Sequence, residues 1–80
     1  MMTQESERRL DDVFRAVLNL APDRDLKALS QIDTPTWDSL AHVTLVAAVE
    51  GEFHVAIDIV DALELTSYQA VRHYLESHAK

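Results

Sequence analysis

Residues 38–53 read Asp-Ser-Leu-Ala-His-Val-Thr-Leu-Val-Ala-Ala-Val-Glu-Gly-Glu-Phe, and this stretch decides the fold. Its first residues are polar and its apolar residues then recur at helical spacing, which predicts a helix over 38–53. At about 100° of rotation per residue, one face of that helix collects four apolar side chains and is the expected core side. These are Leu45, Val46, Val49 and Phe53.

A second apolar stripe on the same helix consists of Leu40, Val43 and Ala47. It lies about 130° from the first face, so it either widens the buried face or stays exposed as a strip on which another protein docks. We favour docking, because a chain of 80 residues has little else with which to cover the strip.

The chain before this stretch predicts one amphipathic helix and a long connection. Apolar residues at 10, 13, 14, 17 and 18 follow the i, i+3, i+4 pattern, so we expect a helix from residue 3 or 6 to residue 18. Residues 19–36 contain both prolines and form a connection of a length that is often functional. Its expected anchors in the core are Leu26, Leu29 and Ile32.

The chain after residue 53 predicts one short helix and one longer helix. Residues 54–59 alternate like a strand but have no second strand to pair with, so we expect an extended connection there. Residues 60–65 are expected to form a short helical piece. Thr66 and Gln69 have the spacing of a capping box, which predicts a last helix that runs to about residue 77 and points Val71, Tyr74 and Leu75 inward.

The predicted fold class is therefore all-α, a small bundle of three main helices plus one short helix, with a long loop between the first two main helices. We interpret residues 1–80 as a single domain, because this length supports one thin core. Phe14, Phe53, Tyr68 and Tyr74 are expected to be core residues.

Composition and charge restrict the possible functions. The chain has no Cys, which excludes a disulfide, a zinc-thiolate site and a thiol nucleophile of its own. No apolar stretch is long enough to span a membrane, and the first residues do not resemble a secretory signal, so we expect a cytoplasmic protein without membrane insertion. The four His residues show no spacing typical of a metal site, and we expect none.

The acidic residues are unevenly placed, within a formal net charge of −7. Residues 38–71 contain six acids and no Lys or Arg. Such a surface repels nucleic acid and anionic lipid and attracts basic proteins, although the same acidity also serves solubility. We therefore expect no nucleic-acid partner.

The most informative residues are Trp37, Asp38, Ser39 and Leu40, where the long loop meets the predicted helix. A serine at a helix N-terminus lies in the positive end of the helix dipole, where an attached phosphodiester would be held favourably. Asp38 and Ser39 also match the ordinary pattern of a helix N-cap, which is sufficient to explain them when they are taken alone.

From residue 38 onward the chain resembles the acyl carrier protein family. The matching positions are Asp38-Ser39-Leu40, Val43-Thr44-Leu45-Val46, Glu50-Gly51-Glu52-Phe53, Ile57, Ala62, Thr66-Ser67-Tyr68-Gln69-Ala70 and Tyr74-Leu75. The first helix and the long loop agree with the family in length and periodicity. In that family the serine of Asp-Ser-Leu is esterified by 4′-phosphopantetheine, which a separate Mg²⁺-dependent transferase takes from coenzyme A.

The resemblance implies that Ser39 carries 4′-phosphopantetheine, flanked by Asp38 and Leu40. The protein would then be a carrier and not an enzyme, because the thiol of the arm holds an acyl or aminoacyl group as a thioester for partner enzymes. The implied partners are a phosphopantetheinyl transferase, a loading ligase or acyltransferase, and downstream synthases or transferases. The expected docking residues are Leu40, Val43, Ala47, Glu50, Asp58 and Asp61, and carriers of this size are usually monomers.

Some positions depart from the pattern of fatty-acid carriers. Helix positions that are usually acidic there hold Ala41, His42 and Thr44, and Thr36-Trp37 replaces a Gly and an aliphatic residue. The arrangement resembles stand-alone carriers of specialised biosynthetic or cell-surface pathways. We interpret His42 as a structural histidine, and Trp37 as an anchor of the loop in preference to a contact for the pantetheine arm.

Two other functions compete with the carrier. An acidic helical adaptor would bind a basic protein through the same stripe and carry no cofactor. A self-contained hydrolase is disfavoured, because Asp38, Ser39 and His42 share one helical turn and cannot build the geometry of nucleophile, base and oxyanion hole.

Overall fold

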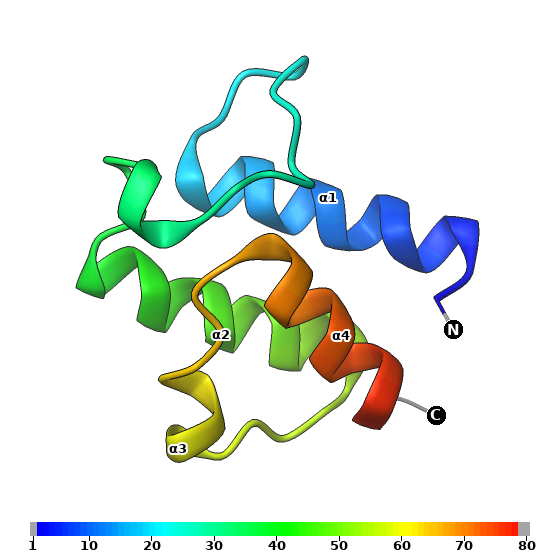
Figure 1. Cartoon of the computed structure of the whole chain (residues 1–80). Helices are drawn as coiled ribbons and strands as arrows, with labels where there is room; N and C mark the ends of the chain where they lie inside the picture. Colours follow the sequence, from blue (N-terminus) through cyan, green and yellow to red (C-terminus); the bar gives the residue numbers. More distant parts are fainter. Residues whose placement is uncertain (1, 79–80) are drawn as a thin grey trace.

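The computed structural model describes residues 2–78 (Figure 1). Within this range the chain forms α1 (Gln4–Leu18), the 3-10 turn η1 (Gln31–Asp33), α2 (Ser39–Phe53), α3 (Ile59–Ala62) and α4 (Tyr68–His78). The prediction of an all-α bundle with three main helices and one short helix is confirmed.

The two longest helices lie side by side and run in opposite directions (Figure 1). The long loop 19–38 joins them at one end, so that the start of α2 lies where this loop meets the bundle. After α2 the chain returns in an extended segment to α3 and then enters α4. Ser39, as the first residue of α2, therefore stands at the junction of loop and bundle.

Helix ends are set by local chemistry that the sequence encodes. The side chain of Thr3 caps α1 by accepting the N–H of Ser6, and Asp38 caps α2 by accepting the N–H of Ala41. Asn19 and His54 close the two helices in the left-handed conformation, with φ of 55° and 56°. Each closing residue donates its N–H to a carbonyl one turn back, which ends the helix without an unpaired carbonyl at that point.

The core forms between the inner faces of the three main helices and the loop. Leu45 and Val49 of α2 are fully buried, while Val46 and Phe53 of the same predicted face are half-buried. Phe14 of α1 lies at the centre, with its ring 5.6 Å from Trp37 and 5.2 Å from Tyr68. Aromatic pairs at these separations stabilise the fold beyond the burial of their surface area. The loop and α4 therefore share one aromatic cluster with α1.

The long loop is anchored by two of its three predicted side chains. Leu26 and Leu29 are buried, but the prediction for Ile32 is wrong, because this side chain is 93% exposed. Ile32 lies in η1, a tight turn of three residues that buries none of its side chains. Backbone hydrogen bonds hold the loop instead, from the N–H of Gln31 to Thr66 O (2.8 Å) and from the N–H of Tyr68 to Leu29 O (3.0 Å).

The C-terminal half differs from the prediction in three local details. The short helix spans Ile59–Ala62, so it begins one residue earlier and ends three residues earlier than predicted. Its start is set by the Asp58 side chain, which accepts the N–H of Val60. The predicted N-cap of α4 at Thr66 is wrong, since the hydroxyl of Ser67 accepts the N–H of Ala70 at 3.0 Å. The extended connection predicted over 54–59 is shorter, because His54 closes α2 in the left-handed conformation and Ile59 begins α3; residues 55–58 between them belong to no helix or strand. Val71 and Leu75 are buried, and Tyr74 is half-buried.

None of the helices in residues 2–78 has the length and apolar character needed to cross a membrane.

Candidate functional site

Ser39 is exposed and is the first residue of α2. Asp38 performs the capping, because its Oδ1 accepts the N–H of Ala41 at 2.8 Å and its carbonyl accepts the N–H of His42 at 2.9 Å. The N–H groups of Ser39 and Leu40 belong to the first helical positions, which have no carbonyl partner within the helix. The Ser39 hydroxyl therefore lies beside the positive end of the helix dipole without being needed as a cap.

Trp37 holds the loop that presents Ser39. Its side chain is only 2% exposed and packs edge-on against Phe14, while its backbone N–H donates to Thr34 O at 2.9 Å. Its indole N–H donates to Nδ1 of His42 at 3.1 Å. The interpretation of Trp37 as an anchor of the loop is confirmed, and the anchor lies two residues before Ser39.

His42 is a structural histidine, as predicted. It is half-buried, its ring stacks near Trp37, and its Nε2 lies 2.7 Å from the carbonyl oxygen of Ala62. Both ring nitrogens are thus occupied. His78 stacks on Tyr74 at 4.0 Å. Within residues 2–78, no three His, Cys, Asp or Glu side chains gather where they could hold a metal ion.

The second apolar stripe of α2 remains outside the core. Leu40 is 77% exposed, Val43 is 67% exposed, and Ala47 is also exposed. On α3, Ile59, Val60 and the C-cap residue Leu63 are also more than half exposed. Ile59 and Leu63 line the same hollow as Val43 and Ala47, and we call these four side chains the α2–α3 apolar surface.

A hollow of about 340 Å³ lies within this surface, between α2 and α3. Apolar side chains from both elements line it, including Val43, Val46, Ala47, Ile57, Ile59 and Leu63. His42, Glu50 and Ala62 complete the lining. The hollow lies on the side of the bundle that α3 covers, and its residues follow Ser39 along α2.

The three predicted acidic docking residues differ in exposure. Asp58 is exposed, whereas Glu50 and Asp61 are half-buried. The Glu50 carboxylate accepts the N–H of Ile57 at 2.7 Å, so it also fixes the segment that leads into α3. Burial and, second, the negative charge of Asp61 raise the pKa of Tyr74. Of these three, only Asp58 is exposed, and its Oδ1 also accepts the N–H of Val60.

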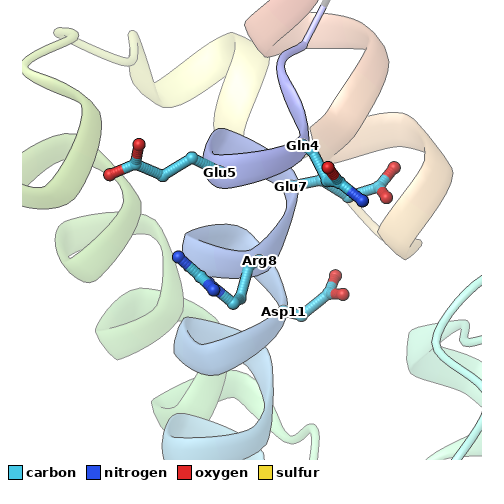
Figure 2. A pocket seen from close by; sticks show the side chains of 5 residues that line it. All are labelled: Gln4, Glu5, Glu7, Arg8 and Asp11. Carbon is cyan, nitrogen blue, oxygen red and sulfur yellow. The ribbon is translucent and has the colours of Figure 1, made fainter.

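A separate hollow on the first turns of α1 does not form a comparable site. It is lined by Gln4, Glu5, Glu7, Arg8 and Asp11. In the view of Figure 2, Glu5 and Arg8 point to one side of α1 and the other three point to the opposite side. Glu7 already pairs with Arg72, and Asp11 accepts the Tyr68 hydroxyl. These side chains form a solvated helix surface and do not converge on one point.

The structure does not assemble a hydrolase from Asp38, Ser39 and His42. Nδ1 of His42 accepts from Trp37 and Nε2 bonds to Ala62 O, while a carboxylate oxygen of Asp38 is used as the helix cap. The ring therefore has no free nitrogen with which to take a proton from Ser39. Ser39 is an exposed serine at a helix start and is not activated as a nucleophile.

The sequence patterns did not predict that α3 contributes to the exposed apolar surface, or which hydrogen bonds His42 makes. Residues 59–63 hold three large apolar side chains in five positions, a density that could have indicated an exposed surface in so short a helix. The bond from Trp37 to His42 joins residues five apart across a helix start. No spacing rule for helices or strands covers that geometry.

Comparison with known proteins identifies three relatives. The acyl carrier protein of Bdellovibrio bacteriovorus is 38% identical over 72 residues, which cover 90% of this chain and 92% of that protein. The acyl carrier protein of Buchnera aphidicola is 30% identical over 74 residues, covering 92% and 94% of the two chains. Acyl carrier protein 4, chloroplastic, of Arabidopsis thaliana is 31% identical over 90% of this chain and 53% of its own length. No protein-family model matches the chain, and no solved structure matches it significantly.

Proposed function

The chain belongs to the acyl carrier protein family and is a carrier, not an enzyme, and we propose that Ser39 is the residue to which its 4′-phosphopantetheine arm is attached. The observation that carries this proposal is the position of Ser39, which is exposed at the first residue of α2 directly after the capping Asp38. The serine is accessible to a transferase, and its substitution leaves the cap in place.

The residues around Ser39 fit a phosphodiester. The N–H groups of Ser39 and Leu40 and the positive end of the α2 dipole favour an anion at this point. Asp38 is turned to the helix and occupied by the N–H of Ala41. When attached, the arm supplies the thiol that this chain lacks, because the sequence has no Cys. The chain's own residues hold the attachment point and present the adjoining surface.

The proposed partners are a phosphopantetheinyl transferase, an enzyme that loads the acyl or aminoacyl group, and a synthase or transferase that removes it. They would dock on Leu40, Val43 and Ala47, which are exposed along α2 next to Ser39. Residues 38–71 carry six acids and no base, so a basic rim on the partner would complement this surface. Glu50, Asp58 and Asp61 belong to that acidic set.

We place the protein in a specialised pathway of the cytoplasm, acting as a monomer. Ala41, His42 and Thr44 occupy positions of α2 that are usually acidic in carriers of fatty-acid synthesis. His42 is half-buried and bonded, and Thr44 donates its hydroxyl to Leu40 O at 3.1 Å. The first two turns after Ser39 are consequently apolar and neutral, which favours partners other than those of a general fatty-acid synthase.

The test is modification of the purified protein. The chain is incubated with coenzyme A, Mg²⁺ and a broad-specificity phosphopantetheinyl transferase, and its intact mass is measured, with the adduct located by fragmentation. We expect one phosphopantetheinyl group on Ser39 and none on Ser39→Ala. Ser67→Ala is the matched control, because it removes a serine that caps another helix. An adduct on another residue, or no adduct while a control carrier is converted, would refute the assignment and favour the cofactor-free adaptor.

A further inference from the structure

The short helix α3 is not held in place by burial of its own side chains. None of its four residues is buried, and Ile59 and Val60 are 75% and 61% exposed. A helix of one turn is not stable alone in water, so its position must come from contacts with the rest of the fold. Nevertheless α3 forms one wall of the hollow beside α2.

Two polar contacts with α2 hold the segment at its ends. Before α3, the N–H of Ile57 donates to Oε2 of Glu50 at 2.7 Å. At its last residue, the carbonyl oxygen of Ala62 lies 2.7 Å from Nε2 of His42. Both α2 side chains line the hollow, so they span the space between the helices and set their separation.

The tautomer of His42 follows from its partners. An indole N–H only donates and a carbonyl oxygen only accepts. Nδ1 must therefore be unprotonated to accept from Trp37, and Nε2 must carry the proton to donate to Ala62. Because Trp37 is itself buried against Phe14, the ring is fixed from the core side before it reaches α3.

We propose that His42 is a positioning residue for recognition by the phosphopantetheinyl transferase: it transmits the fixed position of Trp37 to α3 and so holds Ile59 and Leu63 beside Val43 as one preformed docking surface for that enzyme. The inference rests on the proposed carrier function. Without the hydrogen bond between His42 and Ala62 O, which we call the tether, the segment would stay bonded to Glu50 through Ile57, but α3 would move at its C-terminal end. A partner would then have to order α3 as it binds, which weakens binding and leaves the later chemical step unchanged.

The experiment compares three substitutions in the full apo chain. His42→Gln retains an amide that reaches to the position of Nε2 and can donate to Ala62 O. His42→Asn places its amide near the position of Nδ1 and cannot reach Ala62. His42→Ala removes both contacts. His73→Ala, an exposed histidine on α4, is the matched control.

The first readout is the steady-state kinetics of the phosphopantetheinyl transferase with each chain as substrate. Loss of one hydrogen bond changes an equilibrium constant by about five-fold. We therefore expect KM to rise by about that factor for His42→Ala and His42→Asn, with kcat unchanged. His73→Ala should retain the original KM, and His42→Gln, which keeps the bond to Ala62 but not the one to Trp37, should raise KM less than His42→Ala or His42→Asn. Equal KM values for all four variants, or an equal rise for Gln, Asn and Ala, would overturn the proposal.

The second readout needs no partner. Hydrogen exchange of the Ala62 and Leu63 amides, which bond to Asp58 O and Ile59 O, should accelerate in His42→Ala and His42→Asn, with that of the Phe14 amide in α1 unchanged. In the unmodified chain, nitrogen NMR should show the His42 ring protonated at Nε2 only. The opposite tautomer would overturn the tether even if a variant failed to fold. Failure of the carrier assignment is separate, because then Ser39 of the parent chain would not be modified at all.

Discussion

The hydroxyl of Tyr68 donates a hydrogen bond to Oδ1 of Asp11 at 2.5 Å, which joins the first residue of α4 to the middle of α1. The two residues are 57 positions apart in the sequence. The backbone N–H of Tyr68 also donates to Leu29 O, so one residue connects α4 to α1 and to the long loop. The ring of Tyr68 is buried against Phe14. Its hydroxyl can therefore be tested without disturbing the packing.

Tyr68→Phe should lower the free energy of unfolding by about 1 kcal/mol, because it removes one hydrogen bond to a charged group and keeps the ring in place. Asp11 is half-buried and regains water as a partner, which limits the loss. Urea denaturation followed by circular dichroism measures the change. Tyr74→Phe, on a half-buried ring of the same helix, is the control. A loss as large as that of a core truncation would mean that the hydroxyl supports more than this contact.

Stability should also fall at high pH through Tyr68. Burial and, second, the hydrogen bond to Asp11 raise the pKa of Tyr68 above its ordinary value of 10.0. Above pH 10 the unfolded chain releases this proton while the folded chain retains it, so the unfolded state binds fewer protons and gains relative stability. The contribution is complete below pH 10 and is lost as the pH rises further. The free energies of unfolding of the parent chain and of Tyr68→Phe should therefore differ by a constant amount below pH 10 and converge as the pH rises above 10. Parallel pH dependences of the two proteins would contradict the shift.

At the start of α2, we expect Asp38 to affect stability through its cap and Ser39 to affect only modification. Asp38→Ala should cost about 1 kcal/mol of stability, because the N–H of Ala41 loses its acceptor, whereas Asp38→Ser should cost less because a hydroxyl still caps. Ser39→Ala should leave the melting temperature nearly unchanged and abolish modification. Thermal melts and intact mass measured on the same preparations test both statements. A large loss of stability in Ser39→Ala would show that the serine has a structural role.

Helix existence and the position of Ser39 were predictable because they depend on local signals. Apolar spacing defines α1 and α2, and Asp38 is a strong cap directly before Ser39. The direction of individual loop side chains was not, since Leu29 and Ile32 have the same chemistry and only the turn η1 decides that one is buried and the other exposed. Thr66 and Ser67 are similarly ambiguous, because both hydroxyls suit a cap and one residue separates them.

The hydrogen bonds that connect different elements at the site could not be predicted from the sequence. The separation of Trp37 and His42 fits no regular element, and the bond between His42 and Ala62 joins residues 20 apart across a connection without periodicity. Glu50 was predicted as an acidic docking residue from the resemblance to carriers. Its bond to the N–H of Ile57 shows that the same carboxylate also organises the backbone.

Truncation of side chains on the two apolar faces of α2 should change the free energy of unfolding by very different amounts. Leu45→Ala should cost about 2 to 5 kcal/mol, because it removes a fully buried side chain and leaves a cavity. Leu40→Ala and Val43→Ala should leave stability within about 0.5 kcal/mol, because both side chains are mostly exposed.

The same two surface variants should weaken recognition by the phosphopantetheinyl transferase, seen as a higher KM, because a partner that docks beside Ser39 buries these side chains. Ile32→Ala is the matched control, as Ile32 is an aliphatic side chain on the loop that is even more exposed than Leu40 and Val43. Its KM should equal that of the parent chain. If Leu40→Ala and Val43→Ala kept the parent KM, the exposed stripe would not be a docking surface for this enzyme. If they instead lost stability as Leu45→Ala does, the stripe would belong to the core.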